Sequence, residues 1–152
     1  GRTGYVHKNM TDEYQEADNS IFPDRARIVA LAETMMGIPY MWGGNSVKAF
    51  DCSGFTSTVF RKEGYQLPRD ASMQVEFGEE IEPDSSYSNI LPGDLIFFGS
   101  PTRITHVGIC LGGSYFIHAS GDVHINSLDE DDELFNSYRK RTFRHIKRII
   151  KN

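Results

Sequence analysis

Helix-like patterns occupy the first half of this chain, and short strand-like segments occupy most of the second half. From Gly93 onward, five segments are rich in β-branched and aromatic residues and are separated by Gly, Ser, Pro or Asp: GDLIFFG, HVGICLGG, YFIHAS, DVHINSL and FRHIKRII. Their short connections favour antiparallel pairing. Helices followed by strands are typical of an α+β domain, in which helices pack on one face of a sheet.

Three segments before Gly93 combine apolar residues at helical spacing with residues suited to helix ends. We expect helices within residues 23–36, from Cys52 to Glu63, and within residues 68–78. Asp51 is the expected N-cap of the second helix, and Asp70 or Ser72 that of the third. Gly37 is expected to close the first helix.

The length and charge of the chain limit its organisation and its partners. We expect one domain over residues 23–152, preceded by a polar arm over residues 1–22. The formal net charge of −5 argues against nucleic-acid binding, and the basic residues 139–152 fit a terminal strand or short helix with solvated Lys and Arg. No apolar run approaches the about 20 residues of a membrane span, and none resembles a signal peptide.

The two cysteines have different surroundings. Cys110 lies in the apolar segment HVGICLGG, where a thiol packs as a small hydrophobic group. Cys52 lies at an expected helix start, where unpaired N–H groups and the helix dipole can lower a thiol pKa from about 8.5 to about 3.5–7.5. Gly54 in the same turn indicates close approach of another backbone segment. Locally, Cys52 fits a reactive or a buried thiol, and pairing with Cys110 stays open.

A cysteine nucleophile needs a base and usually a group that orients the base. Of the five histidines, His106 begins one expected strand and His118 ends the next, whereas His124 is expected to face solvent. A regular two-residue turn at Gly112-Gly113 would place His106 and His118 on opposite faces of the sheet. Their pairing therefore predicts a loop with an odd number of residues or a β-bulge.

The same three side chains, Cys52, His106 and His118, are also ligand types for zinc. The sequence lacks the local C-x-x-C or H-x-x-x-H clustering that usually accompanies such a site. We therefore expect no metal and no organic cofactor.

Five sequence blocks occur in a characteristic order: PYMWGGNSVKAFDCSGF, LPRDASMQ, LPGDLIFF, HVGICLG and FIHAS. Over residues 28–150 the chain thereby resembles the NlpC-type cell-wall cysteine peptidases. The resemblance implies a papain-like α+β fold, with N-terminal helices packed on a mostly antiparallel sheet of five to six strands. It also implies a bacterial or phage-derived hydrolase of peptidoglycan stem peptides or muropeptides. Many members cut the bond from the γ-carboxyl of D-glutamate to meso-diaminopimelate or L-lysine.

The resemblance also implies roles for individual residues. By position, Cys52 is similar to the family nucleophile, His106 to the base and His118 to the polar residue that orients the base. Tyr40 resembles a tyrosine of the oxyanion site, although Tyr40 and Trp42 could also be anchored aromatic residues.

A second set resembles substrate-binding positions. Asp51 and Ser53 resemble residues that hold the free amino group of the substrate in the dipeptidyl branch of the family. The other members of the expected set are Trp42, Arg69, Asp70 and Ser72.

Alternative functions are an N-acetylmuramoyl-L-alanine amidase and a catalytically silent module that binds wall peptides. We expect the bacterial cell envelope as the location, or the cytoplasm if the enzyme recycles muropeptides. The opening GRTGYV resembles the last strand of a bacterial SH3-like module, which would then precede this domain in the parent protein.

Overall fold

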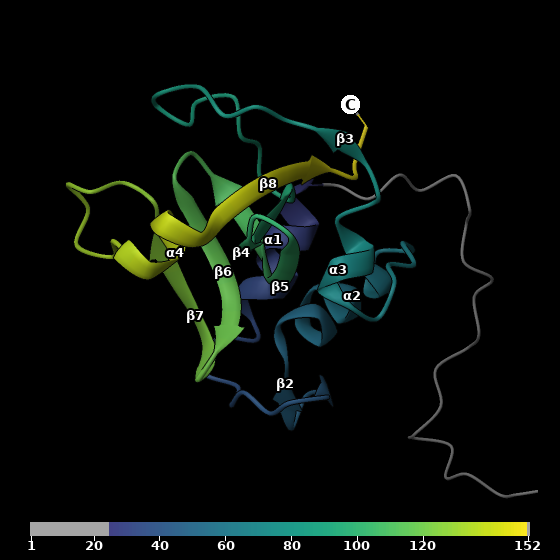
Figure 1. Ribbon diagram of the computed structural model, residues 1–152. Helices are drawn as coiled ribbons and strands as arrows, with labels where there is room; N and C mark the ends of the chain where they lie inside the picture. The colour runs from purple at the N-terminus through teal and green to yellow at the C-terminus, as the bar shows by residue number, and fades with distance from the viewer. Residues whose placement is uncertain (1–24, 152) are drawn as a thin grey trace, which may run out of the picture.

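Six strands form one antiparallel sheet in the computed structural model, which describes residues 25–151 (Figure 1). Their order across the sheet is β3-β8-β4-β5-β6-β7, and every neighbouring pair is antiparallel. The strands are β3 (Glu79–Glu80), β4 (Leu95–Ser100), β5 (Arg103–Gly112), β6 (Tyr115–Ser120), β7 (Asp122–Ser127) and β8 (Phe143–Arg148). The predicted arm and its SH3-like strand lie outside the described residues.

The helices follow the predicted order, with shorter bounds. They are α1 (Arg25–Glu33), α2 (Cys52–Lys62), α3 (Ala71–Gln74) and α4 (Ser137–Thr142). The first helix ends well before Gly37, and hydrogen-bonded turns connect it to that glycine. In Figure 1, α2 and α3 lie together on one side of the sheet, whereas α4 lies at the opposite end beside β7.

Two apolar clusters cover the two faces of the sheet. The first packs α1 and α2 against β4, β5 and β6 through side chains such as Phe55, Val59 and Val107. The second lies on the other face, where Cys110 packs with Phe98 and other buried side chains. Cys110 is therefore a packing residue, as predicted, and both cysteines are free thiols. Among residues 25–151 no helix is long and apolar enough to cross a membrane.

A buried carboxylate connects the beginning and the end of the described domain. Asp94, which is fully buried before β4, accepts hydrogen bonds from Arg25 at 3.0 Å and from Arg148 at 2.7 and 3.1 Å. Arg25 also donates to the carbonyl of Ile150 at 2.5 Å. These ion pairs attach α1 and the end of β8 to the same edge of the fold.

Candidate active site

Cys52 is the first residue of α2, and Asp51 caps that helix as predicted. One carboxylate oxygen of Asp51 accepts the Gly54 N–H at 2.6 Å, and the other accepts the Gly43 N–H at 2.9 Å. The same side chain thus caps α2 and binds the preceding loop. This holds Cys52 at the junction of the loop and the helix.

Gly54 permits a close contact between α2 and that loop. A Cβ atom at this position would lie 2.0 Å from the Gly44 carbonyl oxygen, nearer than a side chain can approach. The same oxygen accepts the Asp51 N–H at 2.9 Å. The prediction that Gly54 marks a close backbone approach is therefore confirmed.

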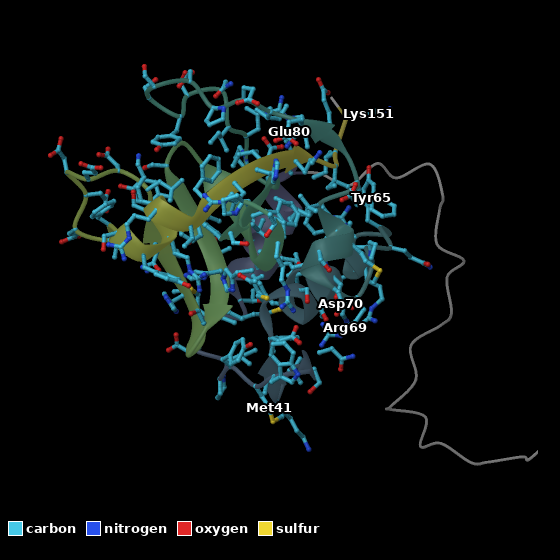
Figure 2. The ribbon with its side chains drawn as sticks, viewed as in Figure 1. Met41, Tyr65, Arg69, Asp70, Glu80 and Lys151 are labelled. Carbon is cyan, nitrogen blue, oxygen red and sulfur yellow. The ribbon has the colours of Figure 1, made fainter. Side chains whose placement is uncertain are left out.

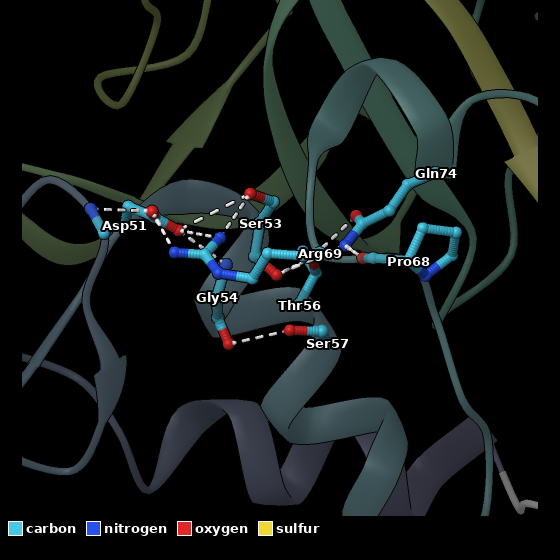
Figure 3. Close-up of polar contacts among 9 residues, drawn as sticks. Asp51, Ser53, Gly54, Thr56, Ser57, Pro68, Arg69 and Gln74 are labelled. Carbon is cyan, nitrogen blue, oxygen red and sulfur yellow. Dashed lines mark hydrogen bonds and ion pairs between the residues drawn. The ribbon is translucent and has the colours of Figure 1, made fainter.

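Arg69 binds the helix cap from the opposite side (Figure 3). Its guanidinium donates to the two oxygens of Asp51 at 3.0 and 2.5 Å, and to Ser53 Oγ at 3.1 Å. Such bidentate pairs fix orientation as well as charge. Each carboxylate oxygen of Asp51 therefore accepts one hydrogen bond from a backbone N–H and one from Arg69.

Gln74 attaches the segment before it to the first turns of α2 and was not predicted as a site residue. This side chain is fully buried, accepts from Thr56 Oγ1 at 2.9 Å, and donates to the carbonyls of Ser53 at 3.2 Å and Pro68 at 2.8 Å (Figure 3). Asp70 stands at the N-cap position of α3 but makes no side-chain capping bond. Position alone could not identify Gln74, because two of its partners, Ser53 and Thr56, lie on a different helix.

Burial dominates the electrostatics of Cys52. Desolvation raises the pKa of the thiol, and the charge of Asp51 raises it further. Backbone hydrogen bonding, chiefly from Val107, and the charge of Arg139 lower the pKa but do not reverse the direction. The helix start, which can lower a thiol pKa, is therefore outweighed at Cys52 by burial. The hydrogen bond from the Val107 backbone does place the Cys52 sulfur beside β5, one residue after His106.

A β-bulge places the two predicted histidines on one face of the sheet. Gly112 pairs with Tyr115, so the two turn residues are Gly113 and Ser114 rather than Gly112 and Gly113, and the register between β5 and β6 shifts between Cys110 and Gly112. His106 Nε2 and His118 Nδ1 consequently lie 2.7 Å apart. Gly108 leaves room for this contact, since a Cβ there would lie 3.1 Å from the Cβ of His118. The predicted pairing is confirmed, together with the bulge that it required.

Both histidines lie within strands rather than at strand ends. β5 begins three residues before His106, and β6 has the bounds of the predicted segment YFIHAS, in which two residues follow His118. His106 is 6% exposed and His118 is fully buried. Burial lowers the pKa of His106 well below 6.5. Burial also lowers the pKa of His118 to about 3, although the hydrogen bond with Asn126 acts in the opposite direction. His124 is less exposed than predicted, because its ring lies 4.6 Å from that of His118.

Arg139 of α4 was also missed by sequence reasoning. Its guanidinium lies 5.4 Å from the centre of the Phe98 ring and donates to Ser120 Oγ at 3.2 Å. The positive charge of Arg139 lowers the pKa of the Cys52 thiol and of both histidines. Nothing in the sequence distinguishes it from the basic residues around it, which were read as solvated.

Backbone pairing places Tyr40 near the thiol. Its N–H donates to the Gly121 carbonyl at 2.8 Å, and it forms a bridge with Phe50, just before the α2 cap. Burial raises the pKa of the Tyr40 phenol, and the neighbouring charge of Cys52 raises it further. Trp42 is 88% exposed, so the alternative of an anchored aromatic residue does not apply to it.

A pocket of about 580 Å³ brings most of the predicted residues together. Its predicted members are Tyr40, Trp42, Asp51, Cys52, Ser53, Arg69, Asp70 and Ser72. Figure 2 shows Arg69 and Asp70 side by side near α2, with Met41 in the neighbouring loop. Residues 103–105, the start of β5, also line the pocket and were not predicted. His106 and His118 are not among the lining residues.

Metal-ligand types do not cluster around the thiol. Within the described part of the chain, no group of three or more His, Cys, Asp or Glu side chains is arranged to hold a metal ion. Cys52, His106 and His118 therefore do not form the ligand set considered from their residue types.

Comparisons with known proteins agree with this architecture. The model of the NlpC/P60 family matches residues 37–147. The probable endopeptidase p60 of Listeria welshimeri is 45% identical over 92 residues, which cover 60% of this chain and 17% of that protein. The murein DD-endopeptidase MepS/murein LD-carboxypeptidase of Escherichia coli K12 is 34% identical over 129 residues, or 83% of this chain and 63% of that protein.

Two further matches extend the comparison. A gamma-D-glutamyl-L-lysine dipeptidyl-peptidase of Bacillus subtilis is 38% identical over 95 residues, covering 60% of this chain and 31% of that protein. The crystal structure of the NlpC/p60 domain of the peptidoglycan hydrolase SagA has a TM-score of 0.67 at 33% identity, covering 82% of this chain and 98% of that one. The chain thus spans less than two thirds of each of these three sequence relatives.

The six-stranded sheet with its packed helices and the family match define the class of this chain as an α+β domain of the NlpC/P60 type. The chain belongs to the NlpC/P60 family, as the order of its sequence blocks predicted.

Proposed function

We propose that this chain is a cysteine endopeptidase that hydrolyses peptidoglycan stem peptides. The bond is the amide from the γ-carboxyl of D-glutamate to meso-diaminopimelate or L-lysine. The observation that carries the proposal is the position of Cys52, which lines the pocket at a helix start and contacts the β5 backbone beside His106. The hydrogen bond between His106 and His118 supports the assignment of His106 as the base and His118 as the residue that orients it.

In this mechanism the proton rests on the Cys52 sulfur in the empty site, since burial raises the thiol pKa and lowers that of His106. As sulfur attacks the γ-glutamyl carbonyl, His106 accepts the proton through Nδ1, the nitrogen not bonded to His118. His106 then donates it to the leaving amine, and water hydrolyses the thioester. Tyr40 and the backbone N–H at the start of α2 stabilise the oxyanion.

The pocket walls carry the proposed substrate contacts. Trp42 offers an exposed aromatic face, and Asp70 and Ser72 face the pocket from the α3 side. A free amino group bound by Asp51 and Ser53 would have to share these side chains with Arg69. Defined muropeptides with and without a free N-terminal L-alanine measure this contact directly. A preference for the free amine places the chain with dipeptidyl-peptidases, and equal cleavage supports an endopeptidase.

Cys52→Ala tests the proposal. We expect it to abolish cleavage of L-Ala-γ-D-Glu-diaminopimelate peptides, followed by mass spectrometry, while the protein stays folded. Cys110→Ala is the matched control, because that thiol packs on the other face of the sheet. Persistent turnover by Cys52→Ala would refute the assignment of the nucleophile.

The same measurements separate the alternative functions. An amidase would release L-alanine peptides from N-acetylmuramic acid, which the product masses identify. A silent binding module would cleave nothing, and its Cys52 would react with iodoacetamide no faster than Cys110. Either result would replace the endopeptidase proposal.

We propose the bacterial cell envelope as the site of action, because intact peptidoglycan is the proposed partner. Comparing isolated sacculi with released muropeptides as substrates tests this. Activity restricted to muropeptides would favour a cytoplasmic recycling enzyme instead.

A further inference from the structure

The hydrogen bonds behind His118 continue across β7 to the start of α4. His118 Nε2 lies 3.0 Å from Asn126 Oδ1. The same oxygen accepts Asn136 Nδ2–H at 2.9 Å. Asn136 is the N-cap of α4, where its Oδ1 accepts the Arg139 N–H at 3.0 Å. Three consecutive side-chain contacts thus join the helix cap to His106, because His118 also lies 2.7 Å from His106.

The helix cap determines the direction of this chain of bonds. A backbone N–H at a helix start can only donate, so the Asn136 atom facing it must be the oxygen. The amide nitrogen of Asn136 then faces Asn126 and can only donate. The Asn126 atom between Asn136 and His118 must therefore be its oxygen. The Asn126 amide nitrogen, on its other side, donates to the Leu134 carbonyl at 3.4 Å.

An oxygen at this place fixes the proton positions on both histidines. Because Asn126 Oδ1 only accepts, His118 must carry its proton on Nε2. The neutral ring then has a bare Nδ1, which accepts from His106 Nε2–H. His106 Nδ1 is left without a proton. We propose that Asn136 and Asn126 are positioning residues that set the tautomer of the His106–His118 pair and keep His106 Nδ1 free to accept a proton.

The surroundings of the two histidines keep both imidazole rings neutral. His118 is fully buried, and its pKa of about 3 leaves it neutral at ordinary pH. The charged or titratable groups that act on the two rings are His124 from β7 and Arg139 from α4, and both disfavour an added proton. With neutral rings, tautomer choice rests on hydrogen bonds alone.

The same donor and acceptor roles hold at every stage of the proposed reaction. In this respect the inference rests on the proposed function. When the proton moves from Cys52 sulfur to His106 Nδ1, the resulting imidazolium carries protons on both nitrogens. Its Nε2–H still needs an acceptor, which only the bare Nδ1 of His118 provides. No proton has to move along the two asparagines at any stage.

Asn136→Asp tests the proposal. The aspartate still caps α4, because a carboxylate also accepts the Arg139 N–H, but it cannot donate to Asn126. Asn126 must then turn its amide nitrogen toward the new carboxylate and toward His118. We expect the His118 proton to move from Nε2 to Nδ1 in ¹H–¹⁵N correlation spectra, and kcat/KM to fall by about 10²-fold, the lower end of what an acid–base group contributes.

Asn89→Asp is the matched control. Asn89 also accepts a backbone N–H, from Asp84 at 3.0 Å, and donates to a carbonyl, that of Glu82 at 2.7 Å, but in an exposed loop away from the pocket. It should leave both tautomers and kcat/KM unchanged.

Asn126→Asp provides a second variant in case Asn136→Asp does not fold. A carboxylate there accepts from both neighbours, so the His118 proton stays on Nε2, but the negative charge raises the pKa of His118 and moves the acid limb of kcat/KM to higher pH. The spectra are read without substrate, so failure of the proposed function and failure of this inference are separate results. A wild-type His118 protonated on Nδ1, or a folded Asn136→Asp variant with wild-type tautomers, overturns the inference.

Discussion

Replacing Gly54 with alanine tests whether the contact between α2 and the preceding loop holds the site together. An alanine Cβ would lie 2.0 Å from the Gly44 carbonyl oxygen and 2.9 Å from Asp51 Oδ1, so the loop or the helix must move. Movement weakens two bonds made by Asp51, its N–H to Gly44 and its carboxylate to the Gly54 N–H. Cys52 lies between these bonds and is displaced with them.

The size of the effect follows from three contributions. Overpacking costs about 1–3 kcal/mol, and a weakened N-cap costs about 1 kcal/mol. The better helix propensity of alanine offsets about 1 kcal/mol of this. We expect the free energy of unfolding to fall by about 1–3 kcal/mol, and Tm to fall by about 2–12 °C.

Thermal and urea unfolding followed by circular dichroism measure the stability, and kcat/KM on a stem peptide measures the site. Ser57→Ala is the control, because it adds an alanine one turn later on the same helix, where the serine hydroxyl only bonds to the Gly54 carbonyl. We expect that control to be as stable as wild type or slightly more so. A Gly54→Ala variant with wild-type stability and wild-type kcat/KM would refute the reasoning.

Two further predictions concern the buried charges of the fold and the site. Asp94→Asn leaves Arg25 and Arg148 without their shared counter-charge and should lower the free energy of unfolding by about 3 kcal/mol in urea titrations; an unchanged midpoint would show that these ion pairs contribute nothing. The acid limb of kcat/KM should lie below pH 6.5, because the base must be unprotonated and burial lowers the pKa of His106. An acid limb above that value would contradict the assignment of His106.

Local signals were sufficient to predict how Cys52 is presented. Asp51 before an apolar stripe predicted the helix and its cap, and Gly54 predicted a close backbone contact. The pairing of His106 with His118 was also predictable. Side chains alternate between the two faces of a strand, so the register of β5 and β6 decides whether the two histidines share a face. The bulge followed from that arithmetic.

Features that depend on contacts between distant segments were not predictable. The thiol pKa reflects burial of Cys52 by surrounding elements, which outweighs the local effect of the helix start. Arg69 binds Asp51 across 18 positions of the chain, and nothing in either local segment encodes that pairing. Asn126 and Asn136 come from a strand and a helix cap, and each is unremarkable in its own segment.

The separation between the pocket walls and the histidine pair has a consequence for how such a domain can diversify. Around the start of α2, the walls come from the loop that holds Tyr40, Trp42 and Gly43, from residues 69–72 and from the start of β5. The histidines are held instead by hydrogen bonds among β5, β6, β7 and the cap of α4. Substitutions or insertions in the first two wall segments can reshape the pocket without disturbing the proton positions behind it. Descendants of one ancestor can thus acquire pockets of different shape while inheriting the same histidine pair.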